Sequence, residues 1–256
     1  IGIQTVMLEE DASTPISKSE GIIEYRLDRL GIPLVEIATD SSINSPQTAR
    51  EVAEHIGMLL RSTDVVRGIG SIRQDINISI EGGSRIEIKG FQELEKIPYA
   101  VENEVNRQVS LLEIKEELKK RGFKEIKSKS SDVTDVFRNT KSNFIRKVID
   151  THGFVYALLL PKFSGLLRRP CGDRTFGKEL SAYAEAYGLG IIHSDEDVNR
   201  YGLGFEFSKL KTELKSGPED LVVVTAGYNK SQIDNAIALL VARANNCIVG
   251  VPEETR

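Results

Sequence analysis

The stretch that decides the fold runs from Gly70 to Lys89 and reads GSIRQDINISIEGGSRIEIK. Isoleucine alternates with polar residues on both sides of a Gly-Gly pair, which is typical of two antiparallel strands joined by a turn. The pattern predicts strands over residues 71–80 and 85–89. Because the isoleucines of both strands must be buried on one side of the hairpin, its polar side chains gather on the other side.

The alternation also restricts how the two strands pair. A two-residue turn would place polar residues opposite isoleucines, and a slip of one residue would turn whole faces the wrong way. A three-residue loop over 82–84 avoids this mismatch and pairs Ser79 with Glu87 and Asn77 with Lys89. Such loops need a residue in the left-handed conformation, which glycine adopts without strain.

The polar face predicted in this way mixes carboxylates with cations. Its members are Arg73, Asp75, Asn77, Glu87 and Lys89. Carboxylate oxygens suit a hard cation such as Mg²⁺, whose ligands must converge at about 2.0–2.1 Å, and cationic side chains suit phosphate. The alternative is a solvent-exposed sheet face with ion pairs, which contribute only about 0–1 kcal/mol each.

Two further groups of carboxylates end or interrupt predicted strands near the start of the chain. Glu9, Glu10 and Asp11 follow an apolar run, and Glu36 lies inside the otherwise apolar segment 34–37. A carboxylate in an apolar strand is costly unless it is paired or bound to a metal. Either Glu36 joins the polar face of the hairpin, or it points to water from an edge strand.

Outside the hairpin, the chain reads as two α/β units joined by a lysine-rich stretch at residues 123–130. We expect strands over residues 1–8, 22–28, 34–39, 154–160, 189–193 and 220–225. We expect helices over residues 45–62, 98–121, 141–151, 178–187 and 229–245, and a loop over residues 12–21. The helix 98–121 is expected to bury Ile97, Val101, Val105, Val109 and Leu112.

The composition excludes several classes of protein. The 256 residues are 40% hydrophobic and 28% charged, with a formal net charge of −4, which is ordinary for a globular protein. Two cysteines are too few for a disulfide framework or a zinc site, so we expect a reducing, cytoplasmic setting. The chain starts at Ile1 inside a predicted strand, and we interpret it as part of a longer protein.

Four stretches together carry a family resemblance: residues 1–11 (IGIQTVMLEED), 29–40 (RLGIPLVEIATD), 70–79 (GSIRQDINIS) and 85–89 (RIEIK). They resemble the cradle domain of the B/E subunits of tRNA-dependent amidotransferases. Residues 167–190 and 221–244 resemble the domain inserted in bacterial aspartyl-tRNA synthetases. A cradle followed by that insertion is similar to the archaeal E-type subunits of glutamyl-tRNA(Gln) amidotransferases.

The resemblance implies a fold and a division into domains. An incomplete mixed-sheet cradle domain of the α/β class is expected over residues 1–127, and an α+β insertion domain over residues 128–256. The family's first strand would lie before Ile1, and its tRNA-binding C-terminal domains would lie beyond Arg256. We therefore expect this chain alone to be inactive.

The resemblance also implies a reaction. Members of this family use ATP and Mg²⁺ to phosphorylate the γ-carboxylate of glutamate misacylated on tRNA(Gln), and ammonia then displaces the phosphate to give Gln-tRNA(Gln). The ammonia comes from an asparaginase-like amidohydrolase, the D-type subunit, which forms a heterodimer with the E-type subunit. Phosphoryl transfer depends on positioning and charge neutralisation more than on a protein nucleophile, which suits a face of carboxylates and cations.

The resemblance assigns roles to residues at matching motif positions. The acids that fall where the family has metal ligands are Glu10, Glu36, Asp75 and Glu87. Arg73 and Lys89 lie in the same motifs, and we expect them to contact phosphate or the glutamyl carboxylate as catalytic groups. Glu9 and Asn77 are expected to support the metal ligands without binding the ion.

Three basic residues of the second half are weaker candidates for a functional role. Arg168, Arg169 and Arg174 could contact tRNA phosphates, with an ordinary solvated loop as the alternative. Two rival functions also stay open. One is a non-catalytic tRNA-binding module in which residues 130–256 dock RNA. The other is an unrelated ATP-dependent ligase that shares the carboxylate hairpin by chance.

Overall fold

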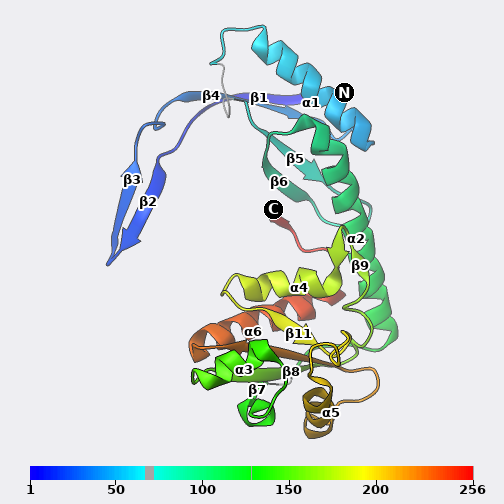
Figure 1. Cartoon of the computed structure of the whole chain (residues 1–256). Helices are drawn as coiled ribbons and strands as arrows, with labels where there is room; N and C mark the ends of the chain where they lie inside the picture. Colours follow the sequence, from blue (N-terminus) through cyan, green and yellow to red (C-terminus); the bar gives the residue numbers. More distant parts are fainter. Residues whose placement is uncertain (67–71, 128, 256) are drawn as a thin grey trace. The chain divides into compact units, whose positions relative to one another are not determined.

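The computed structural model describes residues 1–66, 72–127 and 129–255 (Figure 1). The chain divides into two compact units: unit 1 comprises residues 1–73 and 92–98, and unit 2 comprises residues 74–91 and 99–256. Gly70 and Ser71, at the expected start of the hairpin, and Ser128, at the expected domain boundary, lie outside the described residues. The division at residue 127 rests on family resemblance and stays a prediction.

Two small antiparallel sheets and a helix form most of unit 1. β1 (Ile3–Glu10) pairs with β4 (Pro33–Thr39), and β2 (Thr14–Ser19) pairs with β3 (Ile22–Arg26). Helix α1 (Pro46–Arg61) begins as the sequence predicts, because the Ser45 side chain accepts a hydrogen bond from the Thr48 N–H. The 3-10 helix η1 (Leu94–Lys96) lies against it, with Glu95 Oε1 2.7 Å from Arg50 Nη2.

The prediction of a loop over residues 12–21 is wrong, because strand β2 occupies most of that segment. The connection from β2 to β3 consists of Glu20 and Gly21, which have positive φ angles of 44° and 82°. Two consecutive positive φ angles give a turn whose twist matches that of the flanking strands. Because β2 is mostly polar, the hydrophobic pattern did not predict this hairpin.

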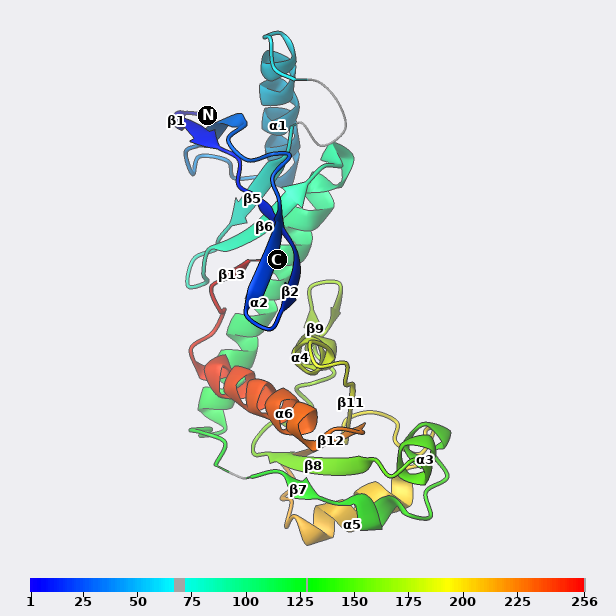
Figure 2. The ribbon, with the colours of Figure 1, turned by 90° about the vertical axis from the view of Figure 1, so that its left-hand side faces the viewer.

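A four-stranded antiparallel sheet with helices on both faces forms the larger part of unit 2 (Figure 2). Its strand order is β11 (Ile191–His193), β12 (Leu221–Gly227), β8 (Phe154–Leu160) and β7 (Ser131–Asp132). One face packs on α4 (Phe176–Glu185) and α6 (Lys230–Asn245), and the other on α3 (Asn143–Asp150) and α5 (Gly204–Glu213). Every residue of β12 is buried, as its unbroken apolar run requires.

The predicted mixture of α and β structure is confirmed, with one helix missed. The sequence did not predict α5, although Leu203, Phe207 and Leu210 recur at helical spacing and are buried on the sheet. Unit 2 also contains the short elements β9 (Pro170–Cys171), β10 (Arg174–Thr175), η2 (Thr134–Phe137) and η3 (Asn246–Ile248). In the part of the chain that the structure describes, no helix is long and apolar enough to span a membrane.

The predicted hairpin belongs to a separate three-stranded sheet of unit 2. β5 (Gln74–Ile78) pairs antiparallel with β6 (Ile86–Phe91), and β13 (Glu254–Thr255) pairs parallel with the outer edge of β6. The predicted separation of faces is confirmed, because Ile78 and Ile86 are buried whereas Asp75 and Asn77 are exposed.

The predicted register of the hairpin is wrong by two residues. Asn77 lies opposite Glu87 rather than Lys89, and Ile78 lies opposite Ile86. A shift of two preserves the side to which every side chain points, so the alternation alone could not distinguish the two registers. The connection is longer than predicted and turns where Gly83 N–H donates to the Ile80 carbonyl, 3.0 Å away.

Helix α2 (Ile97–Lys120) supports this sheet, and the predicted buried stripe is confirmed only in part, because Ile97 is buried and Leu112 packs against the core. Leu111, Ile114 and Leu118 are buried in the same cluster as Ile86, whereas Val109, a member of the predicted stripe, is exposed. The buried side continues toward the start of the helix through three polar residues, Glu104, Arg107 and Gln108. A search for apolar periodicity cannot find a stripe of this kind.

Candidate functional site

The polar face of the β5–β6 hairpin is the best-formed part of the predicted site. Glu87 is about one-third exposed, and its Oε2 atom lies 3.4 Å from Lys89 Nζ. Thr255 Oγ1 donates a hydrogen bond of 3.4 Å to the same oxygen. Asn77 lies directly across the ladder from Glu87. The hairpin therefore presents a carboxylate, an ammonium group and an amide on one surface whose opposite side is buried.

Asp75 lies on this hairpin at an irregularity in the ladder. The register shifts between Gln74 and Ile76, and Asp75 Oδ1 accepts a 2.7 Å hydrogen bond from the Gly90 N–H. Gly90 has a φ of 65°, a left-handed conformation that glycine adopts readily. One carboxylate oxygen of Asp75 thus secures the bulge, and Oδ2 is the oxygen that this bond does not use.

Arg73 differs from the prediction that placed it on the strand. It precedes β5, it is exposed, and it belongs to unit 1. There the pKa of Asp11 lies below its ordinary value, chiefly because Arg29 donates a hydrogen bond to it, with a smaller Coulomb contribution from Arg73. Arg73 is thus a cation near the end of β1, where the predicted acids Glu9 and Glu10 lie.

The register of β1 and β4 separates two of the predicted metal ligands. Met7 lies opposite Glu36 and Glu9 lies opposite Leu34, so Glu9 and Glu36 occupy diagonal positions on one face. Glu10 follows Glu9 and, by the alternation of strand side chains, belongs to the other face. The pair that β1 and β4 bring together is therefore Glu9 with Glu36, rather than the predicted Glu10 with Glu36.

The four-acid ligand set as a whole stays a prediction. Glu10 and Glu36 belong to unit 1, and Asp75 and Glu87 belong to unit 2. Among residues 1–66, 72–127 and 129–255, no three His, Cys, Asp or Glu residues form a group that could hold a metal ion. What each unit supplies separately is a pair of carboxylates on strands, whose oxygen donors suit Mg²⁺.

The three arginines predicted to contact tRNA lie around the β9–β10 hairpin of unit 2. Arg169 Nη2 is 4.0 Å from Glu117 Oε2, and Arg174 Nε is 3.4 Å from Asp173 Oδ1, while Arg168 is exposed. Acidic partners thus already compensate part of the charge of Arg169 and Arg174. Contact of these residues with tRNA stays a prediction.

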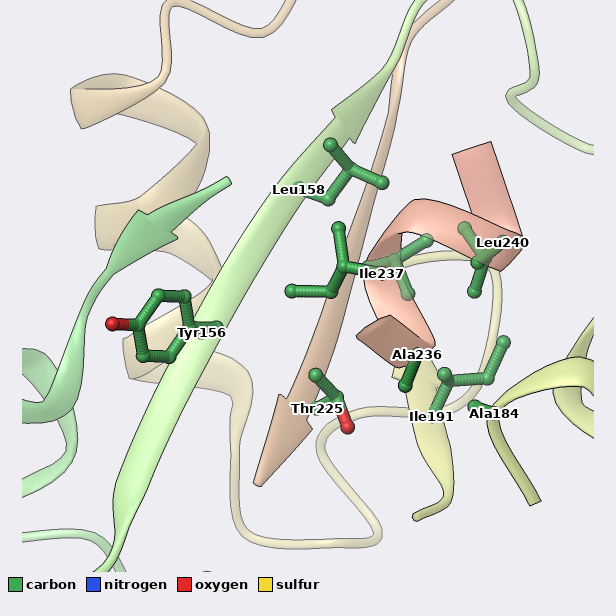
Figure 3. Close-up of a pocket in the computed structure, with 9 residues that line it drawn as sticks. Tyr156, Leu158, Ala184, Ile191, Thr225, Ala236, Ile237 and Leu240 are labelled. Atoms are coloured by element: carbon green, nitrogen blue, oxygen red, sulfur yellow. The ribbon is translucent and has the colours of Figure 1, made fainter. Parts of the chain in front are cut away.

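A small apolar pocket in the packed core of unit 2 offers no room for a substrate (Figure 3). It lies between the four-stranded sheet and helices α4 and α6, where Leu158, Ile237 and Leu240 line it. Its volume is about 10 Å³, room for about one water molecule. Both cysteines are buried and unbridged, and burial raises the pKa of the Cys247 thiol to about 11, which keeps it in its unreactive protonated form.

A group of charges in unit 2, of which all but Glu254 are buried, was not predicted from the sequence. We call it the Arg107 cluster, and its members are Arg107, Glu104, Glu179 and Glu254. Arg107 Nε donates to Glu179 at 2.8 Å, Nη1 donates to Glu104 at 3.0 Å, and Nη2 donates to Glu254 at 2.5 Å. Burial by itself would lower the pKa of Arg107, but Glu179, and then Glu104 and Glu254, outweigh burial and raise it above its ordinary value.

Comparison with known proteins gives this geometry a context. The model of a family described as the GatB/GatE catalytic domain matches residues 1–156. The chain is 48% identical over 261 residues to the E-type subunit of glutamyl-tRNA(Gln) amidotransferase from Pyrococcus abyssi. It is 46% identical over 259 residues to the protein of that name in Archaeoglobus fulgidus, and 42% identical over 261 residues to that in Methanococcus maripaludis. Each comparison covers all of this chain and 41% of the relative.

The family model covers only part of the second half of the chain, whereas the relatives match all of it. The family model ends at residue 156, beyond the predicted boundary at residue 127. The expected likeness of the second half to the inserted domain of aspartyl-tRNA synthetases therefore stays a prediction. The chain spans about two-fifths of the length of the curated relatives it matches.

Proposed function

The chain belongs to the GatB/GatE catalytic domain family, and from this membership we propose that it forms part of the E-type subunit of a glutamyl-tRNA(Gln) amidotransferase. The proposed activity is ATP-dependent conversion of Glu-tRNA(Gln) to Gln-tRNA(Gln). The similarity to archaeal E-type subunits supports the assignment, because it extends over the whole chain.

The chemistry proposed for the site has two steps. A γ-carboxylate oxygen of tRNA-bound glutamate attacks the γ-phosphorus of ATP, and ADP leaves with the bridging oxygen. Ammonia then adds to the acyl phosphate carbonyl, and inorganic phosphate leaves, which forms the amide of glutamine. Activation comes first because a carboxylate is a poor electrophile, and phosphate is a far better leaving group than oxide.

The proposed first step uses residues of the hairpin together with residues of unit 1. We propose that Lys89 and Arg73 bind phosphate oxygens and so oppose the charge repulsion between ATP and the carboxylate. Asp75 and Glu87, with Glu36 and either Glu9 or Glu10, are the proposed ligands of Mg²⁺, which when bound neutralises charge on the phosphates. We propose that Asn77, which lies across the ladder from Glu87, orients that carboxylate. Ammonia is proposed to come from an asparaginase-like partner subunit.

The single observation that carries this proposal is the exposed Asp75–Asn77–Glu87–Lys89 surface on a hairpin whose other side is buried. A functional site needs its groups held to about 0.5 Å, and a strand pair with a packed side holds them better than a free loop does. In a chain similar to amidotransferase subunits over its full length, such a surface is the natural place for phosphoryl transfer.

Glu87→Gln in the full-length protein, assembled with its partner subunit, tests the proposal. The substitution keeps the shape of the side chain and removes its charge. We expect ATP-dependent phosphorylation of Glu-tRNA(Gln) to fall by at least about 100-fold, while the affinity for tRNA stays within about threefold. Formation of ADP in single turnover and filter binding of labelled tRNA measure the two quantities.

The matched control is Glu113→Gln, which changes an exposed glutamate of helix α2 and should leave both quantities unchanged. If the Glu87→Gln protein phosphorylates Glu-tRNA(Gln) at the wild-type rate, the proposed site on the hairpin is wrong. A large loss of tRNA affinity without loss of phosphorylation would favour an RNA-binding role for the hairpin instead.

A further inference from the structure

We propose that Arg107 is a positioning residue for Glu87, acting through Glu254 and strand β13. The proposal rests on the function proposed above, because it concerns the same carboxylate. Arg107 lies on helix α2 behind the hairpin and does not itself belong to the polar face. Its link to Glu87 runs through contacts within unit 2.

Strand β13 has two residues whose side chains point to opposite sides of the sheet. Glu254 pairs with Ile86 and Thr255 pairs with Glu87 along the edge of β6. The Glu254 side chain contacts Arg107 on the buried side, whereas the Thr255 hydroxyl donates to Glu87 on the polar side. Because the two residues are adjacent, holding the Glu254 side chain in place also holds the hydroxyl that contacts Glu87.

Side-chain contacts of Glu254 hold β13 in place. A strand of two residues makes few ladder hydrogen bonds of its own. The Glu254 carboxylate adds a bond to Arg107 and accepts a 3.2 Å hydrogen bond from the Tyr183 hydroxyl of helix α4. A hydrogen bond to an ionised group is roughly twice as strong as one between neutral groups. The Arg107 cluster is therefore an anchor of β13, beside the buried Val251 and the hydrogen bond from Ser84 to its carbonyl.

The other strand of the hairpin is attached to the same cluster. Gln108, the neighbour of Arg107, is fully buried, and its Nε2 donates both to Glu104 of the cluster at 3.1 Å and to the Ile78 carbonyl of β5 at 3.4 Å. The cluster is thus attached to β6 through Glu254 and to β5 through Gln108. Both strands that carry the polar face are connected to the same buried cation.

This connection matters because a metal ligand must be placed accurately. Mg²⁺ tolerates little departure from ligand distances of about 2.0–2.1 Å. Groups that orient metal ligands without binding the ion typically change metal affinity by about 10–100-fold when they are removed. Loosening β13 should therefore weaken Mg²⁺ use, with no direct effect on tRNA contacts elsewhere.

Glu254→Gln in the full-length protein with its partner subunit tests the proposal. We expect amide hydrogen exchange in β6 to become about tenfold faster, while β12 exchanges as in the wild type. We expect the Mg²⁺ concentration for half-maximal phosphorylation of Glu-tRNA(Gln) to rise about tenfold, with an unchanged KM for the tRNA. Thr255→Val, which removes only the hydroxyl next to Glu87, should raise the Mg²⁺ requirement without the effect on exchange.

The matched control is Glu116→Gln, which removes an exposed carboxylate on the same helix that pairs with Lys119. It should change neither readout. Glu254→Gln with wild-type exchange in β6, or with faster exchange but a wild-type Mg²⁺ requirement, overturns the proposal. If Glu254→Gln fails to fold, the Mg²⁺ requirement of Thr255→Val decides it. If the wild type forms no phosphorylated product, the proposed function fails, and the exchange measurement still decides whether the cluster anchors β6.

Discussion

At Asp75, one carboxylate serves both the backbone and the proposed site. Its Oδ1 atom accepts the Gly90 N–H at 2.7 Å, which fixes the bulge, and the proposed metal contact would use its other oxygen. This division explains why the acid lies at an irregular position of the ladder, where a bulge re-aims its side chain. The two oxygens of Asp75 thus contribute separately to stability and to the proposed metal contact, and a single substitution could remove both contributions.

Asp75→Asn should separate these effects, because the amide oxygen can still accept from Gly90 whereas the charge is lost. We expect the free energy of unfolding to change by less than about 1 kcal/mol, and the heat of Mg²⁺ binding in calorimetry to disappear. Asp75→Ala is the comparison, since it removes both contributions and should cost about 1–3 kcal/mol. Equal heats of binding in wild type and Asp75→Asn would rule out Asp75 as a ligand.

His193, a buried residue at the end of β11, gives the stability of unit 2 a pH dependence. Burial lowers its pKa below the ordinary value near 6.5, against opposing contributions from Glu196 and Asp195. The folded state therefore favours the neutral imidazole, and the unfolded state binds the proton more readily. This contribution to stability is fully present above about pH 6.5 and is lost as the pH falls toward the lowered pKa of the folded state.

We accordingly expect the free energy of unfolding to fall between pH 7 and pH 5 more steeply in the wild type than in His193→Gln. Urea denaturation at each pH measures the slopes. His55→Gln, which replaces an exposed histidine of α1, is the control and should keep the wild-type slope. A wild-type slope in His193→Gln would mean that burial does not perturb this imidazole.

At the scale of elements, the hairpin shows what the alternation of apolar and polar residues can predict and what it cannot. The isoleucine pattern predicted which side chains are buried, and it predicted that Asn77 and Glu87 share a face with Lys89. It could not fix the register, because shifts of two residues preserve every face. The register is set by the long connection, which packs on α2, and by the bulge at Asp75. Neither feature can be recognised in the hydrophobic pattern.

Helix α2 shows what hydrophobic periodicity does not reveal. Its ends were predicted to within a residue or two, but its buried side was predicted only in part, because Glu104, Arg107 and Gln108 have the polar character of surface residues. They are buried because Glu179 and Glu254, far along the chain, come back to pair with Arg107. A buried charge needs partners, and a single sequence does not say which distant acids will meet it.

Substitution of Gly90 tests whether the bulge of the hairpin depends on a left-handed backbone conformation at this residue. Its φ is 65°, and a Cβ atom added there would meet nothing within 4 Å, so any cost of Gly90→Ala is conformational. We expect a loss of about 1–2 kcal/mol in the free energy of unfolding by urea. Gly190→Ala is the control, because its added Cβ also meets nothing and its φ is not left-handed; it should be neutral or stabilising by up to about 1 kcal/mol. Equal effects of the two substitutions would contradict this account.

At the scale of the whole molecule, the two compact units divide the chain at other residues than the family boundary at residue 127, which stays a prediction. The hairpin 74–91 joins the larger unit, and residues 254–255 return to pair with it. A resemblance between sequence motifs reports common ancestry, whereas compactness reports which segments pack together. The motifs led to the family, which the match over residues 1–156 establishes. The convergence of acids from both units stays a prediction.

The transfer of oxygen from substrate to phosphate is the sharpest test of the proposed two-step chemistry. The full-length protein with its partner subunit would act on tRNA(Gln) charged with glutamate that carries ¹⁸O in both γ-carboxylate oxygens. Because the proposed route passes one of these oxygens to the departing phosphate, we predict one ¹⁸O in each inorganic phosphate formed with Gln-tRNA(Gln). With Glu87→Gln the amount of this labelled phosphate should fall by at least about 100-fold. Gln-tRNA(Gln) formed together with unlabelled phosphate would contradict the account.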